Sequence, residues 1–217
     1  MRYQAVIFDF DYTLGDATEG IVQSVRHGLK KLGWGPMERE DIRKTIGLSL
    51  EETYRRLTED KSPEQAKLFS GYFREMADQI MVEQTELFPD TRKALAYLKE
   101  KEILTGIVTT KYHYRMDAIL EKFQAADYFD RIVGGEDVSV PKPDPEGVFW
   151  LLDVWKLPKE RVLYVGDSLV DAKTAEAAGV DFAGVTTGTT GREELEAYPC
   201  IGVYEGLSPL FEKVFDY

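Results

Sequence analysis

Two carboxylates stand two residues apart, directly after a short apolar segment near the start of the chain. The segment Ala5–Phe8 is followed by Asp9, Phe10 and Asp11. Because side chains two apart on an extended chain point the same way, Asp9 and Asp11 can address one substrate. Two neighbouring carboxylates repel each other, so one tends to stay ionised while the other holds or shuttles a proton. Two acids that only cap or turn the chain after a strand would give the same pattern.

A second acidic pair, Asp167 and Asp171, follows another apolar run and opens a predicted helix. Asp167 would project from the strand end, and Asp171 lies four residues later, one turn into the helix. Carboxylates from two strand ends are hard oxygen ligands suited to Mg²⁺, which keeps waters that a phosphate can replace. Helix capping by Asp167 or Ser168 is the alternative interpretation, and it does not exclude metal binding.

Two further segments could hold an anion. Lys142 lies between prolines, whose stiff backbone would offer its ammonium group at low entropic cost. Thr109 and Thr110 follow the apolar run 104–108, where a hydroxyl group and backbone amides could hold a phosphate. A solvated lysine in a proline-rich linker would look the same, so neither segment decides the function alone.

Short strands alternating with helices would position these side chains. Apolar runs predict strands at 5–8, 104–108, 131–133, 162–165, 182–185 and 201–203. Helices are predicted at Thr91–Lys101, Tyr114–Phe123, Pro145–Trp155 and Ser168–Ala178, the third of them with Asp144 as its N-cap. This alternation predicts an α/β, doubly wound (Rossmann-like), mostly parallel sheet. Ligands bind such sheets at the carboxyl ends of the strands.

Residues 16–86 interrupt the alternation with helical patterns only. These fall at Thr18–Leu32, Arg39–Ile46, Leu50–Thr58 and Pro63–Val82. A structureless connection of that length is implausible in a compact domain. We therefore expect residues 16–86 to form an inserted α-helical bundle, a cap domain over the carboxyl end of the first strand. The α/β catalytic core would then comprise residues 1–15 and 87–217.

Composition excludes several functional classes. The 217 residues carry 27 Lys and Arg against 39 Asp and Glu, a net charge of −12 that opposes nucleic-acid binding. The single cysteine, Cys200, excludes an internal disulfide and a cysteine-built zinc site. The sequence shows neither a secretory leader nor an apolar run of the ~20 residues that cross a bilayer. We expect a cytoplasmic protein that binds no membrane, as a monomer or homodimer.

Taken in order, the four clusters resemble the motifs of the haloacid dehalogenase-like (HAD) hydrolase superfamily, in its phosphatase branch with a helical cap. Asp9 and Asp11 in DFDYTL fit the DxDxT motif, and GDSLVD fits the acidic fourth motif. Thr109 and Lys142 match the second and third motifs. Within this family the chain is similar to phosphoglycolate phosphatases and their pyrophosphatase and phosphomutase relatives. Tyr12 and Thr110 stand where Gly and Asn are frequent, which bears on the substrate rather than the chemistry.

The resemblance implies a phosphatase that hydrolyses a small phosphorylated metabolite with Mg²⁺ as cofactor. Asp9 would be the nucleophile that becomes an aspartyl-phosphate, and Asp11 the general acid and base. Mg²⁺ would bind the Asp9 carboxylate, the Asp11 backbone carbonyl and Asp167, with Asp171 as support. Thr109, Thr110 and Lys142 would hold the phosphoryl oxygens.

Other functions share parts of this pattern. A phosphomutase of the β-phosphoglucomutase type would use the same acids, and cap residues would decide between the two. Dehalogenases of the same fold lack the second acid of the first motif, so Asp11 opposes that activity. A phosphoacceptor or metal-binding regulator without turnover would also cluster Asp, Thr and Lys at strand ends, but its usual fold has no helical insertion.

Overall fold

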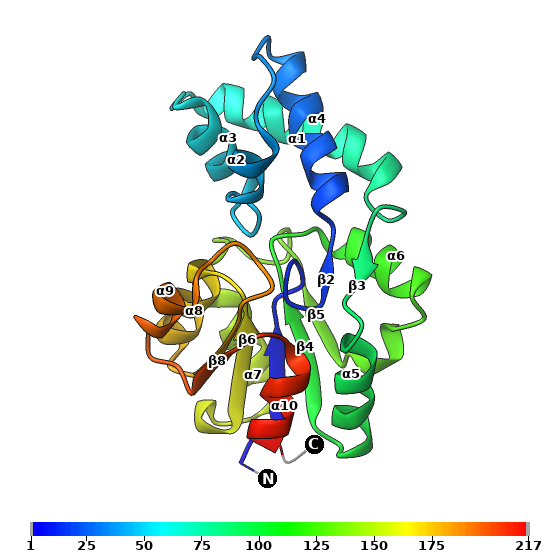
Figure 1. Cartoon of the computed structure of the whole chain (residues 1–217), viewed down its shortest axis with the longest axis vertical. Helices are drawn as coiled ribbons and strands as arrows, with labels where there is room; N and C mark the ends of the chain where they lie inside the picture. The colour runs from blue at the N-terminus through cyan, green and yellow to red at the C-terminus, as the bar shows by residue number, and fades with distance from the viewer. Residues whose placement is uncertain (1, 216–217) are drawn as a thin grey trace. The chain divides into compact units, whose positions relative to one another are not determined.

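A six-stranded parallel sheet forms the centre of the larger part of the molecule (Figure 1). The structure, a computed structural model, describes residues 2–215. The strand order is β5-β4-β1-β6-β7-β8. The strands are β1 (Ala5–Phe8), β4 (Leu104–Val108), β5 (Arg131–Val133), β6 (Val162–Gly166), β7 (Asp181–Val185) and β8 (Gly202–Tyr204). This order places β1 between β4 and β6, the strands that precede the predicted site residues.

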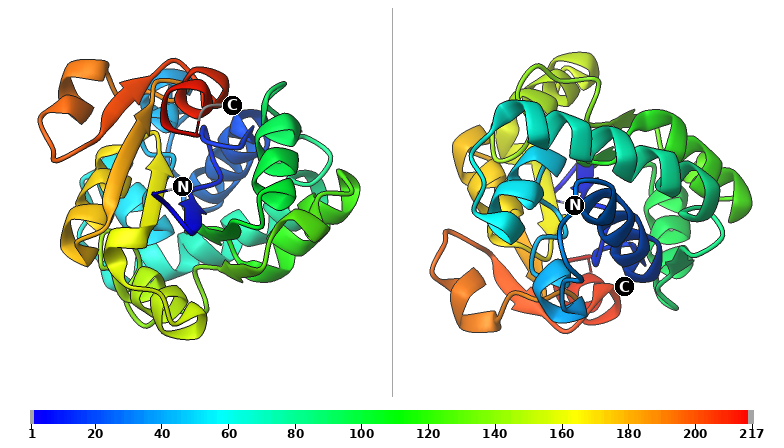
Figure 2. Two further views of the ribbon diagram at one scale, coloured as in Figure 1. Left: turned by 90° about the horizontal axis from the view of Figure 1, so that it is seen from below. Right: turned by 90° about the horizontal axis from the view of Figure 1, so that it is seen from above.

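Helices cover both faces of this sheet (Figure 2). They are α5 (Thr91–Glu100), α6 (His113–Lys122), α7 (Glu146–Trp155), α8 (Leu169–Ala178), α9 (Arg192–Glu196) and α10 (Leu207–Phe215), with short 3₁₀ helices η1 (Ala126–Tyr128) and η2 (Lys159–Arg161). On one face α7 and α8 pack against Ala5, Ile7 and Tyr164. Helices α5 and α10 pack together elsewhere, with Tyr97 edge-on to Phe211. Burial on both faces explains the uninterrupted apolar runs of the central strands, and the α/β fold predicted from the sequence is confirmed.

The backbone contacts divide the chain into two compact units, Met1–Asp16 with Leu87–Tyr217, and Ala17–Glu86. The second unit is helical, with α1 (Thr18–Lys31), α2 (Arg39–Arg43), α3 (Leu50–Thr58) and α4 (Pro63–Ile80). Its apolar core gathers side chains of these helices around Phe69 and Tyr54. Ser49 and Ser62 cap α3 and α4, each accepting a hydrogen bond from a backbone amide.

The two chain segments that join the units pair with each other. Residues Gly15–Asp16 form β2, Glu86–Leu87 form β3, and the two make a separate two-stranded sheet. The expectation that residues 16–86 contain only helices was therefore wrong at both ends. Strands of two residues are too short to show a hydrophobic period, which is why the sequence pattern missed them.

The start of α7 also differs from the expectation. Pro145, and not Asp144, occupies the N-cap position, and the helix begins at Glu146. The Asp144 side chain still contributes, because its Oδ1 accepts a hydrogen bond of 3.0 Å from the Glu146 amide. None of the helices in residues 2–215 combines the length and apolarity needed to cross a membrane.

Candidate active site at the carboxyl end of the sheet

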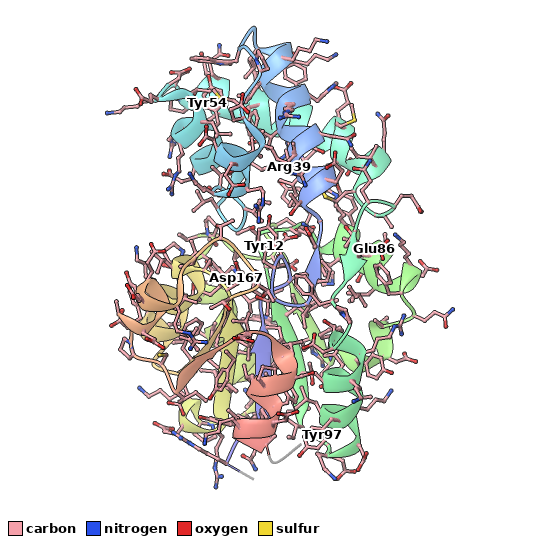
Figure 3. All side chains as sticks on the ribbon, in the orientation of Figure 1. Tyr12, Arg39, Tyr54, Glu86, Tyr97 and Asp167 are labelled. Carbon is pink, nitrogen blue, oxygen red and sulfur yellow. The ribbon has the colours of Figure 1, made fainter. Side chains whose placement is uncertain are left out.

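Three of the predicted site residues each follow the last residue of a central strand. Asp9 follows β1, Thr109 follows β4 and Asp167 follows β6. Sheet-like hydrogen bonds continue into two of them, since the Asp9 amide donates to the Val165 carbonyl and the Thr109 amide to the Val133 carbonyl. Because the strands are parallel and adjacent, these residues emerge at one end of the sheet, where Figure 3 labels Asp167. All three are buried.

Lys142 joins this cluster from the proline-rich segment before α7. Its Nζ donates hydrogen bonds of 2.8 Å to Asp9 Oδ1 and 2.7 Å to Asp171 Oδ1. It also lies 3.3 Å from the hydroxyl of Tyr164. The ammonium group is almost fully enclosed, with only 4% of the side chain exposed. The ordering of Lys142 therefore depends on two carboxylates and one phenol, and not on solvent.

Asp171 is fixed by the start of α8. Ser168 caps this helix in a capping box: its hydroxyl accepts from the Asp171 amide, while Asp171 Oδ2 accepts from the Ser168 amide at 3.1 Å and from its hydroxyl at 2.6 Å. The other oxygen, Oδ1, accepts from Lys142 and from the Tyr164 hydroxyl. Helix capping and site assembly, which the sequence left as alternatives, thus occur together.

Burial dominates the electrostatics of the acids. It raises the pKa of Asp9 to about 7, with Lys142 opposing the shift and the carboxylates of Asp171 and Asp11 reinforcing it. Burial, followed by the charges of Asp171 and Asp9, raises the pKa of Asp167 well above its ordinary value. Burial alone would lower the pKa of Lys142, but Asp171 and Asp9 outweigh it and raise that pKa. The cluster therefore holds more negative charge than its own lysine neutralises.

The donor set fits a divalent cation. Carboxylate oxygens of Asp9, Asp167 and Asp171 lie within 4.8 Å of one another. If all four carboxylates of Asp9, Asp11, Asp167 and Asp171 are ionised, as ligation of a cation favours, they outnumber the ammonium groups of Lys111 and Lys142 by two, and all six residues are buried. The remaining charge of −2 matches one divalent ion, and hard oxygen donors with no sulfur or imidazole favour Mg²⁺. Both carboxylate oxygens of Asp171 already accept hydrogen bonds from Lys142, Tyr164 and Ser168. Asp9 and Asp167 are therefore the acids better able to offer an oxygen to the cation.

Asp11 lies at the same end of the sheet but has a different cationic partner. Lys111 Nζ donates to Asp11 Oδ2 at 2.6 Å, and both side chains are buried. The sequence pattern does not single out Lys111 as a site residue. Its place in TTKYHY resembles that of any loop lysine, and only the fold brings it to Asp11.

The loop after β7 contains two further residues of the site, Thr187 and Gly188, which the sequence pattern does not indicate. The Thr187 hydroxyl donates to the backbone carbonyl of Tyr12, which follows Asp11. Tyr12 adopts a left-handed conformation with φ of 61°, which is unusual for residues other than glycine. A Cβ atom on Gly188 would lie 1.8 Å from Asp167 Oδ2. Close approach to Asp167 therefore requires glycine at this position.

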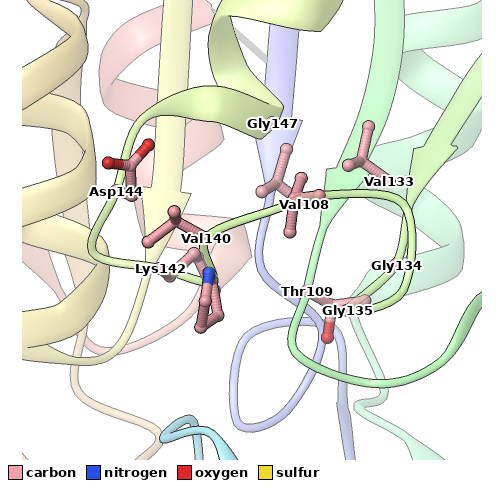
Figure 4. A pocket seen from close by; sticks show the side chains of 11 residues that line it. Val108, Thr109, Val133, Gly134, Gly135, Val140, Lys142, Asp144 and Gly147 are labelled. Atoms are coloured by element: carbon pink, nitrogen blue, oxygen red, sulfur yellow. The ribbon is translucent and has the colours of Figure 1, made fainter.

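Thr109 and Lys142 line one pocket together with Gly134, Gly135 and Val140 (Figure 4). Thr109 Oγ1 accepts a hydrogen bond from the Lys111 amide at 3.2 Å, which leaves its proton free to donate to a ligand. Thr110 is half-buried next to it. Among the hydrogen bonds of residues 2–215, none joins the Thr110 side chain to the other predicted site residues.

Comparison with known proteins supports a shared family. The sequence profile of the haloacid dehalogenase-like hydrolases matches residues 6–185. A pyrophosphatase, PpaX, from Bacillus velezensis is 32% identical over 209 residues, covering 96% of this chain and 95% of the relative. The phosphoglycolate phosphatase of Shigella boydii is 28% identical, covering 95% of this chain and 90% of the relative.

Solved structures agree with the sequence comparison. A crystal structure from Bacteroides fragilis, assigned as a haloacid dehalogenase-like hydrolase, superposes with a TM-score of 0.93 and 44% identity. The alignment covers 96% of this chain and 99% of that one. A structure from Clostridium acetobutylicum, assigned as a phosphatase, has the same fold with a TM-score of 0.92 at 24% identity, covering all of both chains. This chain belongs to the haloacid dehalogenase-like hydrolases and is an enzyme of that family.

Proposed function

We propose that the protein is a Mg²⁺-dependent phosphatase that hydrolyses a small phosphorylated metabolite through an aspartyl-phosphate. The observation that carries this proposal is the environment of Asp9. One of its oxygens is held by Lys142 at 2.8 Å, and the carboxylates of Asp167 and Asp171 lie within 4.8 Å. A buried carboxylate between a fixed cation and a metal-binding pair of acids is suited to attack an anionic phosphorus centre.

The reaction proceeds in two balanced steps. In the first, a carboxylate oxygen of Asp9 bonds to phosphorus, the bond from phosphorus to the leaving oxygen breaks, and Asp11 gives that oxygen a proton. In the second, Asp11 takes a proton from water, the water oxygen bonds to phosphorus, and the bond between phosphorus and Asp9 breaks. The products are an alcohol or acid and inorganic phosphate, and both aspartates regain their initial state.

The positive groups around Asp9 make attack by an anion possible. Lys142 offsets the negative charge of Asp9 and can donate a hydrogen bond to a phosphoryl oxygen. Its contacts with Asp171 and Tyr164 hold its ammonium group in position. Thr109 adds a hydroxyl donor at the end of β4. Mg²⁺, bound by Asp9, Asp167 and the backbone carbonyl of Asp11, would neutralise charge on the transferring phosphoryl group. Asp171 supports this arrangement through its hold on Lys142.

The named relatives support a substrate whose leaving group is small and anionic. One relative is a pyrophosphatase and another a phosphoglycolate phosphatase. Both substrate types place a second negative group close to the phosphoryl group. We propose the same class of substrate for this chain, with selection by the helical unit Ala17–Glu86 acting as a cap.

A screen of phosphorylated metabolites, including pyrophosphate and phosphoglycolate, tests this function through the release of inorganic phosphate. Activity should require Mg²⁺ and disappear with EDTA. Asp9→Asn should lower kcat by more than about a thousandfold, because the nucleophile is removed while the side-chain shape is retained. The matched control is Asp153→Asn, which changes an exposed acid that pairs with the exposed Lys156 and should leave kcat unchanged. Full activity of the Asp9→Asn protein would contradict the proposal.

A further inference from the structure

Each acid of the Asp9–Asp11 pair has a buried lysine of its own. Lys142 contacts Asp9, and Lys111 contacts Asp11 at 2.6 Å, with 6% of the Lys111 side chain and 8% of the Asp11 side chain exposed. Removing two charges from water costs several kcal/mol per ion, and their attraction repays this only with favourable geometry. A buried pair of this kind therefore serves position and specificity more than stability.

The two oxygens of Asp11 have different environments. Oδ2 accepts the hydrogen bond from Lys111, whereas Oδ1 is buried and has no hydrogen-bond partner among residues 2–215. Buried polar atoms without partners are rare in folded proteins, and each one calls for a specific explanation. In a site that binds a phosphorylated substrate, this unpaired Oδ1 is the oxygen that can form a hydrogen bond with a leaving group or with a water molecule.

Lys111 is itself held on several sides. Its amide donates to Thr109 Oγ1 at 3.2 Å, and its carbonyl accepts from the Gly135 amide at 2.8 Å. A Cβ atom on Gly135 would lie 2.6 Å from the Thr110 carbonyl oxygen, so this approach of the two loops depends on glycine. The Lys111 Nζ also lies 5.9 Å from the ring centroid of Phe10, the residue between the two acids. The position of the ammonium group is thus determined by the β4–α6 loop and not by solvent.

We propose that Lys111 is a positioning residue for Asp11: by holding Oδ2 it turns Oδ1 toward the reacting oxygen. The hydrogen bond from Lys111 is compatible with both forms of Asp11 in the reaction. When Asp11 is the acid, Oδ2 is its carbonyl oxygen and Oδ1–H is the donor; when Asp11 is the base, Oδ1 accepts the proton of water. Lys111 neither gains nor loses a proton in either step. This inference rests on the proposed phosphatase function.

Leaving-group dependence separates this role from a structural one. General acid catalysis matters when the leaving alkoxide is basic, and is nearly dispensable for 4-nitrophenolate, which leaves without a proton. The measurement is the rate of leaving-group release in the first turnover, by rapid mixing with Mg²⁺, for 4-nitrophenyl phosphate and for an alkyl phosphate. This first turnover excludes the later attack of water, which would blur the comparison.

Lys111→Met keeps the aliphatic stem and removes the donor. We expect a loss of about a hundredfold or more with the alkyl phosphate, the usual scale of general acid catalysis, and less than about tenfold with 4-nitrophenyl phosphate. Lys111→Arg, which restores a cationic donor, should recover part of the alkyl phosphate rate. Lys156→Met is the control, because Lys156 is an exposed lysine whose partner Asp153 is also exposed.

The outcomes distinguish a failure of the positioning role of Lys111 from a failure of the proposed phosphatase function. If the wild-type protein releases no phosphate from any of these compounds, the proposed function fails. If the wild-type protein is active and Lys111→Met loses equal factors on both substrates, or only raises KM, the positioning role is overturned. Should Lys111→Met fail to fold by circular dichroism, Lys111→Ala, which also removes the donor, takes its place, and its ratio of the two rates decides in the same way.

Discussion

Gly188 shows how closely a single residue can control the acidic cluster. Its backbone lies against Asp167, so that a Cβ atom would approach Asp167 Oδ2 to 1.8 Å. No pair of non-bonded heavy atoms tolerates that distance, so either the loop or the carboxylate must move if Gly188 is substituted. Asp167 has a further contact with the Thr13 hydroxyl at 3.5 Å, which is too long to resist such a shift.

Gly188→Ala should therefore weaken Mg²⁺ binding more than it weakens the fold. Changes beside metal ligands typically cost 10- to 100-fold in metal affinity, and we expect a loss of about this size. Calorimetric titration with Mg²⁺ measures the affinity directly, and the rise in Tm on adding Mg²⁺ should shrink in parallel. Gly35→Ala is the matched control, because a Cβ atom there would meet no atom within 4 Å. An unchanged Mg²⁺ affinity in Gly188→Ala would contradict this interpretation.

Individual residues of the site differ in how well the sequence alone predicts them. Asp9, Asp11, Asp167 and Asp171 could be singled out by their spacing after two apolar runs, although acids that only cap or turn the chain share that pattern. Tyr164, in contrast, looks like an ordinary core residue of β6, and its hydroxyl contacts with Lys142 and Asp171 depend on the folded arrangement. Contacts of this kind depend on distances between elements that are far apart in the sequence, and neither composition nor local spacing contains those distances.

At the scale of elements, the start of α8 connects helix stability with the site. The Ser168 hydroxyl caps the helix and also donates to Asp171, which in turn holds Lys142. Ser168→Ala should therefore lower the free energy of unfolding by about 1 kcal/mol through loss of the cap. It should also lower kcat, because Asp171 Oδ2 loses a hydrogen bond and Lys142 becomes less well placed.

Urea unfolding and steady-state kinetics on the same variants check both halves of this prediction. Ser62→Ala is the matched control: Ser62 caps α4 in the helical unit and accepts from the Gln65 amide at 3.3 Å. It should lose comparable stability without a fall in kcat. Ser168→Thr, which keeps the hydroxyl, should restore most of both losses. If Ser168→Ala lowers stability alone, the connection from Asp171 to Lys142 does not limit turnover.

Strands and helices were predictable from the sequence where their burial produces a regular pattern of apolar residues. The runs for β1, β4 and β5 give their bounds directly. Burial on both faces makes β1 apolar throughout, whereas the edge strand β5 begins with the exposed Arg131. Helix termini were less certain: Asp144 and Pro145 form a typical N-cap and first-turn pair, yet the helix begins one residue later, at Glu146. Asp and Pro also favour turns, and tertiary packing of the Lys142 segment decides between these uses.

At the scale of the whole molecule, the helical unit Ala17–Glu86 is inserted in the sequence of the α/β unit. Removing the helical unit should leave the six-stranded sheet intact. Every predicted catalytic residue, from Asp9 to Asp171, lies in the unit formed by 1–16 and 87–217. The separate apolar core around Phe69 belongs to the helical unit alone. Since β2 and β3 are hydrogen-bonded neighbours, the chain leaves and re-enters the α/β unit at adjacent points. Neighbouring strands lie about 5 Å apart, a gap that a short linker can bridge.

Replacing residues 17–86 by a short Gly/Ser linker should thus give a folded α/β unit. We expect this unit to unfold cooperatively in urea and to retain Mg²⁺-dependent hydrolysis of 4-nitrophenyl phosphate, because both depend on residues outside the deletion. It should lose preference among small phosphorylated metabolites, since a cap both selects the substrate and excludes water during transfer. The ratio of kcat/KM for the preferred metabolite to that for 4-nitrophenyl phosphate measures this, with the intact chain as reference. A folded deletion variant that keeps the full ratio would assign substrate selection to the α/β unit, where Tyr12 beside Asp11 is then the first residue to substitute.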